Sequence, residues 1–297
     1  MHLALLLSVL SKCSSVALLS SKYNALHPRI FHWTRAYVDA HTESKAAVGF
    51  FAKHWGRVLE RHDIIWLRTG TSGGHDLKRF QHEVLERKML KRPFYLLTTD
   101  GDSSFPGKLT LCDHPMVVAW YTQNWDGTKF PCVRPFPIGL DMHTWHDVND
   151  MIEIGKTAPS LAQRKQKIIW AGQLDSPGRI RLVHNNMVAR LPQMSRKKYW
   201  RTIANAAYVA SPPGNGLDCH RTWEALYLGC IVIAEDNSLR NLYKGLKVIT
   251  TRDWSAIKVQ DSWRHTPGKT GPPTVELQAW LPEPLAFQRK QGVVAAL

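Results

Sequence analysis

The sequence predicts an α/β protein with two Rossmann-like domains, each built on a parallel sheet, that face each other across a cleft. The 297 residues exceed the usual length of a single domain. Strand-like and helix-like segments alternate along residues 63–100 and again along 167–251, with a polar stretch at 146–166 between the two blocks. We therefore predict a first domain at 1–150, a second at 151–255, and a tail at 256–297 that packs back on the first domain.

The first block begins with a strand, a helix and a second strand. Residues 63–70 (DIIWLRTG) and 93–100 (PFYLLTTD) are apolar runs typical of buried strands, and 75–92 has the periodicity of an amphipathic helix. A helix is expected around 116–123, before the segment VRPFPIG, which ends in Pro and Gly.

The second block repeats this alternation. We expect strands at 167–172 (KIIWAG), 208–211, 230–234 (CIVIA) and 247–251, with helices at 179–191, 195–207 and 218–228. Gly229 suits the end of the last helix, and an all-apolar run such as CIVIA is typical of a parallel strand covered on both faces. Beyond Trp254 the chain is rich in Pro and Gly, so we expect a loosely packed tail with a possible helix at 284–296.

The composition limits the classes of partner. A net charge of +15 favours anionic partners such as nucleic acid, acidic lipid, acidic glycans or nucleotide diphosphates. The basic residues, including Arg196, Lys197 and Lys198, are scattered, and no nucleic-acid-binding signature accompanies them.

The cysteines and the N-terminus give weaker indications. The five cysteines are widely spaced and odd in number, so buried thiols are expected rather than disulfides or a zinc site; they are Cys13, Cys112, Cys132, Cys219 and Cys230. The apolar run at 3–10 is too short to span a bilayer, and no Asn-x-Ser/Thr sequon occurs. Cytoplasmic and Golgi-associated locations both remain open.

The segment SPPGNGLDCHRTWE combines a strand end, a Gly-rich loop (residues 212–217) and the start of a helix. The glycines permit close backbone approach, and the free N–H groups and positive end of a helix form an anion site suited to phosphates. Asp218 is the expected N-cap, while His220, Arg221 and Glu224 project from one side of the helix, with Glu224 placed to accept hydrogen bonds from ribose hydroxyls. The alternative is a capped helix with an exposed Arg–Glu pair, but the Gly-rich loop favours a nucleotide-diphosphate site. Its predicted members are Gly172, Arg179, Ser211, Pro212, Gly214, Asn215, Gly216, Asp218, His220, Arg221 and Glu224.

The sequence resembles the exostosin-like glycosyltransferases, especially their short xylosyltransferase members. SPPGNGLDCHRTWEALYLGCIVI is very similar to their donor-site signature, and FYLLTTDGDSSFP, WYTQNW, PFPIGLDMHT, IIWAGQLDSPGRIRL and LYKGLKVITTRDW follow the family's order over roughly residues 63–254. This resemblance implies a GT-B fold and an inverting transfer of a sugar, xylose by analogy, from a UDP-sugar to a hydroxyl of a glycan or glycoprotein. UDP-xylose would be the donor substrate, and no tightly bound cofactor is implied.

An inverting transfer needs a base that takes the proton of the acceptor hydroxyl. Asp102 and Asp100, at the end of the strand PFYLLTTD, are the first candidates, with His75 and Asp76 in reserve. Asp100-Gly101-Asp102 also forms the DxD pattern that holds a divalent ion in other sugar transferases, but this short pattern is weak and a polar turn explains it equally well. We expect no metal site, because the helix N-terminus and the basic side chains can stabilise the leaving diphosphate.

Other readings of the chain stay open. The GxxxxGK[ST] and GxGxxG phosphate motifs are absent, which disfavours a kinase or a dehydrogenase. Of the 12 tryptophans, Trp120 and Trp125 lie closest to the predicted acceptor side and are candidates for stacking on a sugar. The competing functions are a nucleic-acid- or polyanion-binding module and a non-catalytic sugar-binding protein.

Overall fold

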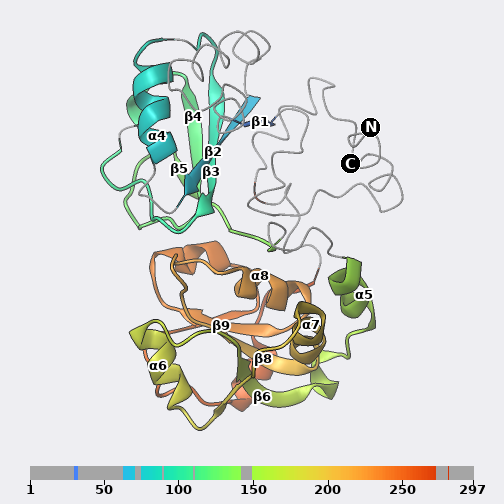
Figure 1. The fold of residues 1–297 in the computed structure, drawn as a ribbon. Helices are drawn as coiled ribbons and strands as arrows, with labels where there is room; N and C mark the ends of the chain where they lie inside the picture. Colours follow the sequence, from blue (N-terminus) through green and yellow to red (C-terminus); the bar gives the residue numbers. More distant parts are fainter. Residues whose placement is uncertain are drawn as a thin grey trace.

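The computed structural model describes residues 30–32, 63–70, 75–88, 90–109, 111–141, 149–271 and 280. Within these residues there are two five-stranded sheets, one in the first half (the described residues up to 141) and one in the second half (residues 149–271). All paired strands in both sheets are parallel. Figure 1 shows the two halves one above the other. The predicted class, α/β with two parallel sheets, is confirmed.

The strands of the first sheet follow one another in chain order. They are β1 (Ile30–His32), β2 (Asp63–Gly70), β3 (Phe94–Gly101), β4 (Val117–Thr122) and β5 (Val133–Pro135). Helix α4 (His75–Phe80) continues as a π-helix (Gln81–Leu85) and covers one face of the sheet, where Leu77 and Phe80 join the same buried cluster as Leu67. The predicted helix at 75–92 is therefore too long.

The helix expected around 116–123 is wrong, because these residues form β4. Five of its six side chains are buried, so the strand shows none of the alternation that identifies a strand from sequence. Its position between β3 and β5 explains this burial on both faces, since interior strands of parallel sheets are covered on both sides.

The second sheet has the strand order β10-β9-β8-β6-β7. These strands are β6 (Lys165–Trp170), β7 (Val188–Arg190), β8 (Ala206–Ser211), β9 (Ile231–Glu235) and β10 (Val248–Thr251). The chain goes from β6 to the edge strand β7 and then returns to β8 on the other side of β6. The carboxyl ends of β6 and β8 thus mark a topological switch point, where α/β sheets bind ligands.

The helices of the second half are α5 (Asn149–Thr157), α6 (Pro177–Val183), α7 (Arg196–Ala204) and α8 (His220–Tyr227). The helix predicted at 179–191 is wrong in its second part, because α6 ends at Val183 and β7 follows. The predicted stop at Gly229 is confirmed: this residue has φ +85°, in the left-handed range that favours glycine after a helix. In Figure 1, α8 lies on the side of the second sheet that faces the first half.

A continuous apolar core joins the two halves. One cluster of buried side chains contains Tyr121, Phe136 and Leu140 from the first half together with Trp200 and Trp223 from the second. Burial of apolar surface is the dominant favourable contribution in folding and in most association. The halves are therefore held together by a shared core as well as by polar contacts.

The described part of the tail packs on the second half. Ile257 is buried in the same cluster as Trp254, and the amide of Gly271 donates to the carbonyl of Leu226 at 2.7 Å. Ile257 and Gly271 anchor residues 255–271 to the second half, while most side chains of this segment are exposed. The helix expected at 284–296 and the apolar run at 3–10 lie outside the described residues. No helix in the described part of the chain is both long and apolar enough to cross a membrane.

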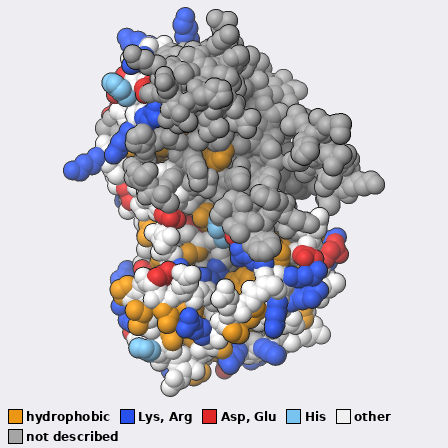
Figure 2. Space-filling view, viewed as in Figure 1, with side chains coloured by type: hydrophobic (Ala, Val, Ile, Leu, Met, Phe, Trp, Pro, Cys, Tyr) orange, Lys and Arg blue, Asp and Glu red, His pale blue; other side chains and the backbone are white. Residues whose placement is uncertain are grey.

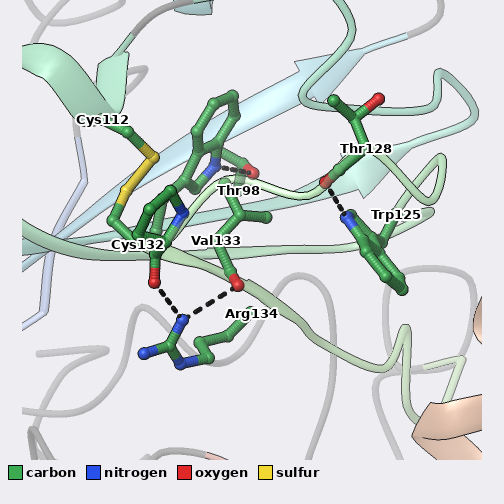
Figure 3. The surroundings of a disulfide bond; sticks show 9 residues. Thr98, Cys112, Trp125, Thr128, Cys132, Val133 and Arg134 are labelled. Carbon is green, nitrogen blue, oxygen red and sulfur yellow. Dashed lines mark hydrogen bonds between the residues drawn. A yellow bond between two sulfur atoms is a disulfide. The ribbon is translucent and has the colours of Figure 1, made fainter.

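Cys112 and Cys132 form a disulfide, which corrects the expectation of buried thiols (Figure 3). Cys112 lies in a short 3-10 helix (Leu111–Asp113) before β4, and Cys132 lies just before β5. Because β4 and β5 are parallel neighbours, the residues that precede them come to the same edge of the sheet, with the two Cα atoms 5.7 Å apart. Cys219 and Cys230 are free thiols, and burial raises the pKa of Cys230 to about 12.

Candidate active site

The described residues enclose a cleft of about 910 Å³ between the two halves. Asp102, just past β3, lines it from the first half, while Gly172 after β6 and Gly214 after β8 line it from the second. The cleft therefore lies at the carboxyl ends of strands from both sheets and at the switch point of the second. This is where the sequence places the nucleotide site.

The predicted site residues divide into two groups. Those that line the cleft are Asp102, Gly172, Gly214, Asn215, Gly216, Asp218, His220, Arg221 and Glu224. Ser211, Pro212 and Arg179 do not line it. The Ser211 hydroxyl bonds that of Thr222 at 2.9 Å, which ties the end of β8 to α8, and Arg179 Nε donates to the Pro213 carbonyl at 3.0 Å. These residues support the Gly-rich loop from behind.

Arg179 departs furthest from its predicted role, which was to bind the nucleotide diphosphate. Its side chain is 9% exposed, and Nη1 pairs with Asp175 Oδ1 at 2.5 Å. A Cβ at Gly214 would lie 3.1 Å from Arg179 Nη2, so the absence of a side chain at Gly214 leaves room for this guanidinium. The positive charge of Arg179, which was predicted to offset the diphosphate, is paired with Asp175 instead. The side chain supports the Gly-rich loop through its hydrogen bond to Pro213.

Asp218 is not the N-cap of α8, because Cys219 occupies that position. The Asp218 carboxylate accepts hydrogen bonds from the amide of Ile138 in the first half at 2.8 Å, from its neighbour Cys219 at 2.9 Å, and from Trp223 Nε1 at 3.0 Å. Burial raises its pKa to about 6 in spite of these hydrogen bonds, which lower it. Asp218 thus joins the loop, the helix and the first half.

Glu224 is buried at the base of the cleft, with 1% of its surface exposed. Arg196 Nη1 lies 3.4 Å from its carboxylate oxygens, and Arg196 Nη2 pairs with Asp141 of the first half. Among the described residues, Glu224 Oε1 has no hydrogen-bond partner of good geometry. Burial, and then the negative charge of Asp141, raise the pKa of Glu224 to about 7, while the charge of Arg196 opposes the shift.

His220 and Arg221 lie on the same helix end as Glu224. His220 Nδ1 is 2.8 Å from the carbonyl oxygen of Gly139, so Nδ1 carries the proton because a carbonyl only accepts. Arg221 donates to the Pro212 carbonyl at 3.4 Å and forms no ion pair with a carboxylate of the described residues. Its charge is therefore directed to the cleft that it lines.

Of the four candidate catalytic bases, only Asp102 has a side chain that the structure describes. Asp102 is partly exposed and lines the cleft from the first half. Asp100 is the penultimate residue of β3, but its side chain, like those of His75 and Asp76, lies outside what the structure describes. In the described ranges no group of three or more His, Cys, Asp or Glu side chains is arranged to hold a metal ion.

Trp120 and Trp125 were predicted to lie on the acceptor side and to stack on a sugar, and the structure shows what surrounds each of them. Trp120 is fully buried, and its Nε1 donates to Thr98 Oγ1 at 2.8 Å, so it belongs to the core and cannot stack on a sugar. Trp125 is partly exposed and donates to the Thr128 carbonyl at 2.9 Å (Figure 3).

Three residues of the cleft region were not predicted. Arg190 lines the cleft with its guanidinium 5.6 Å from the ring of Trp170, and Arg196 and Asp141 bridge the halves below Glu224. Arg196 reads in the sequence as one of many scattered basic residues. The sequence feature that could have singled it out is its position at the start of the predicted helix after Ser195. In the structure this position lines the cleft.

The sequence matches no protein-family model and no curated protein. Among solved structures it is similar to UDP-forming α,α-trehalose-phosphate synthases. One from Burkholderia xenovorans has 14% identity and a TM-score of 0.38, over 71% of this chain and 68% of that chain. The B. xenovorans enzyme in complex with glucose-6-phosphate has 11% identity and a TM-score of 0.39, over 92% and 82%. An enzyme from Burkholderia vietnamiensis has 12% identity and a TM-score of 0.39, over 88% and 82%. Similarity at this level assigns the chain to no family and no activity.

Proposed function

We propose that this chain is a glycosyltransferase that takes a sugar from a UDP-sugar and transfers it to a hydroxyl group of a glycan or glycoprotein. The support comes from the cleft, which combines a Gly-rich loop, the N-terminus of α8, basic side chains and buried carboxylates at the switch point of a parallel sheet. The donor would lie in the second half and the acceptor would approach from the first.

The observation that carries the proposal is Oε1 of Glu224, which is buried, accepts no hydrogen bond of good geometry among the described residues, and has Arg196 Nη1 as an ion-pair partner at 3.4 Å. A buried polar atom without a hydrogen bond is costly, and such atoms are rare in native proteins. Oε1 belongs to a cleft-lining residue about one helical turn into α8, three residues beyond Arg221. A ribose hydroxyl would satisfy this oxygen, while Arg221 and the N-terminus of α8 would offset the diphosphate charge.

The chemistry needs two functions from this chain. Arg221, with His220 and Arg190 nearby, would stabilise the negative charge of UDP as its bond to the sugar breaks. Asp102 would accept the proton of the acceptor hydroxyl while the hydroxyl oxygen forms a bond to the anomeric carbon of the donor sugar. Inversion of the anomeric configuration, xylose as the sugar and membership of the exostosin-like family are all proposed from the sequence resemblance.

Titration calorimetry with UDP tests the site. Glu224→Gln and Arg221→Ala should each weaken UDP binding by roughly 1.5–3 kcal/mol, the range for hydrogen bonds to charged groups, or about 10- to 150-fold in Kd. Unchanged affinity in both folded variants would contradict the site assignment.

A control is needed for the general basic charge. Lys and Arg side chains gather over α5 and α7 in Figure 2, where Lys197, Lys198 and Arg201 belong to α7. Arg201→Ala removes one positive charge outside the cleft and should leave UDP affinity unchanged. Equal losses in Arg201→Ala and Arg221→Ala would favour a polyanion-binding function over a nucleotide site.

A thermal-shift panel of nucleotide sugars would identify the donor, because a ligand of the native state raises its stability by RT ln(1 + [L]/Kd). The anomeric configuration of the product, followed by NMR, would then test inversion. Binding of UDP-sugars without any turnover would instead indicate a non-catalytic sugar-binding protein.

A further inference from the structure

Asn124 connects the two walls of the cleft. It lies in the turn just after β4 and is fully buried. Its Nδ2 donates to the carbonyl of Gly101 at 2.9 Å, next to Asp102, and its Oδ1 accepts from the amide of Asp218 at 2.8 Å, directly after the Gly-rich loop. One side chain therefore bonds the strand end that carries the candidate base and the segment that carries the candidate donor site.

We infer that Asn124 is a positioning residue that holds the end of β3, with Asp102, in register with the Gly-rich loop, so that base and donor face each other. This inference rests on the proposed function. Asn124 touches neither the donor nor the reacting atoms in this arrangement. It acts through the backbone of Gly101 and of Asp218.

The Gly-rich loop is shaped to receive this side chain. A Cβ on Gly216 would lie 2.6 Å from Asn124 Nδ2, closer than real Cβ contacts allow. The φ angle of Gly216 is outside the left-handed range, so its backbone conformation does not require glycine. The need to leave room for Asn124 explains why residue 216 is a glycine. From the sequence, this glycine was predicted only to permit close approach of a ligand.

The backbone of Asn124 suits the same role. Its φ of 51° lies in the left-handed region, which asparagine tolerates better than most residues. This turn aims the side chain across the cleft floor toward Asp218. An alanine here would add backbone strain to the loss of hydrogen bonds, so glycine is the cleaner substitution.

Loss of Asn124 should leave the halves joined. Ile138 N bonds Asp218 Oδ2, the Ser238 hydroxyl donates to the Trp125 carbonyl at 2.6 Å, and Arg196 pairs with Asp141. The shared apolar core adds to these contacts. Removal of Asn124 therefore changes the local register of two loops and leaves the fold intact.

The test separates turnover from binding. Asn124→Gly should lower kcat for release of UDP from the donor by roughly 10- to 100-fold, the scale for small misplacements of reacting groups, and should change the Kd of UDP by less than about twofold. An equal loss of UDP affinity would show that Asn124 merely supports the nucleotide site and would overturn the inference.

Gln123→Met is the matched control. Gln123 Nε2 also donates to the Gly101 carbonyl, at 2.8 Å, and is equally buried, but this bond stays within the first half. The variant should keep kcat near that of the wild-type protein. A loss equal to that of Asn124→Gly would attribute the effect to the end of β3 alone and would contradict a role across the cleft.

A double-mutant cycle tests the steric fit. Gly216→Ala should reduce kcat because its Cβ meets Asn124, and adding Asn124→Gly should cause little further loss because the space is then empty. Fully additive losses would contradict the contact.

Hydrogen exchange makes the test independent of the proposed function. The amide of Asp218 should exchange faster in Asn124→Gly than in Gln123→Met, because only the first variant removes its acceptor. If the wild-type protein failed to bind UDP, the proposed function would fail while this measurement still decided the contact. Unchanged exchange of Asp218 would overturn the inference.

Discussion

Two buried carboxylates of the second half, Asp218 and Glu224, illustrate how surroundings separate structural from ligand-binding roles. Both are less than 5% exposed, and both have raised pKa values, about 6 and about 7. Asp218 accepts hydrogen bonds from three neighbouring residues, whereas Glu224 Oε1 accepts none of good geometry among the described residues. The hydrogen bonds of Asp218 hold the two halves together, while Glu224, paired with Arg196 at 3.4 Å, keeps one oxygen without a hydrogen bond of good geometry, which supports the ligand-binding role proposed for it.

The raised pKa of Glu224 makes a prediction about stability. Its pKa goes from the ordinary value of 4.5 to about 7 in the folded protein, so between these values the folded state binds more protons than the unfolded state. The contribution of Glu224 to stability is then greatest below pH 4.5 and falls as the pH rises through about 7. Glu224→Gln does not titrate, so its Tm relative to the wild-type protein should increase from about pH 5 to about pH 8.

Thermal denaturation at several pH values would measure this difference. Glu153→Gln is the control, since Glu153 is an exposed residue of α5 paired with Lys156 at 2.8 Å, and it should show no comparable trend. A Tm difference for Glu224→Gln that does not vary with pH would mean that the buried carboxyl titrates as an ordinary one.

Asp102 carries the prediction for the chemical step. Asp102→Asn keeps the shape of the side chain and removes its basicity, so kcat should fall by roughly a hundredfold or more while UDP affinity is retained. Asp113→Asn, at an exposed position of the first half, is the control for a general change of charge. Near-normal turnover in Asp102→Asn would move the role of base to Asp100, and then to His75 or Asp76.

At the scale of elements, the strands with strong apolar runs were predictable and the short or fully covered ones were not. β2, β3, β6, β8, β9 and β10 lie at or within two residues of their predicted positions. All three residues of β7, at the sheet edge, are partly or fully exposed, so no alternation of buried and exposed positions identifies this strand. β4 was mistaken for a helix because burial on both faces removes the alternation.

The disulfide between Cys112 and Cys132 ties the 3-10 helix before β4 to the start of β5. It closes a loop with a sequence separation of 20, which corresponds to about 3 kcal/mol of restricted unfolded-chain entropy. The double variant Cys112→Ser/Cys132→Ser should therefore have a lower free energy of unfolding by about that amount.

Denaturation with and without dithiothreitol checks this prediction. The reductant should lower the Tm of the wild-type protein and leave that of the double variant unchanged. A wild-type Tm that does not respond, together with both thiols reactive in the denatured oxidised protein, would show that the bond does not form. The widely spaced cysteines concealed this pair, because the neighbouring strands that bring them together are known only from the fold.

At the scale of the whole molecule, the halves could be predicted from sequence and their junction could not. Gly-rich loops, helix caps and apolar runs are local patterns. The contacts of Asn124 with Asp218 and of Arg196 with Asp141 join residues separated by 94 and 55 positions. In the sequence Asn124, Arg196 and Asp141 read as ordinary polar residues, and Asp218 reads only as a local helix cap and site residue. Their function emerges only when the two sheets are placed together.

The hydrogen bond from the Ile138 amide to Asp218 has a consequence for modular exchange of the halves. The second half alone does not contain every partner of its buried carboxylate, because one donor to Asp218 is a backbone amide of the first half. A chimera that joins residues 149–271 to an unrelated first half would keep the hydrogen bonds from Cys219 and Trp223 but lose this one, at a cost of roughly 1.5–3 kcal/mol for a hydrogen bond to a charged group. A recombination crossover placed before residue 138 would keep the amide and the carboxylate in one segment.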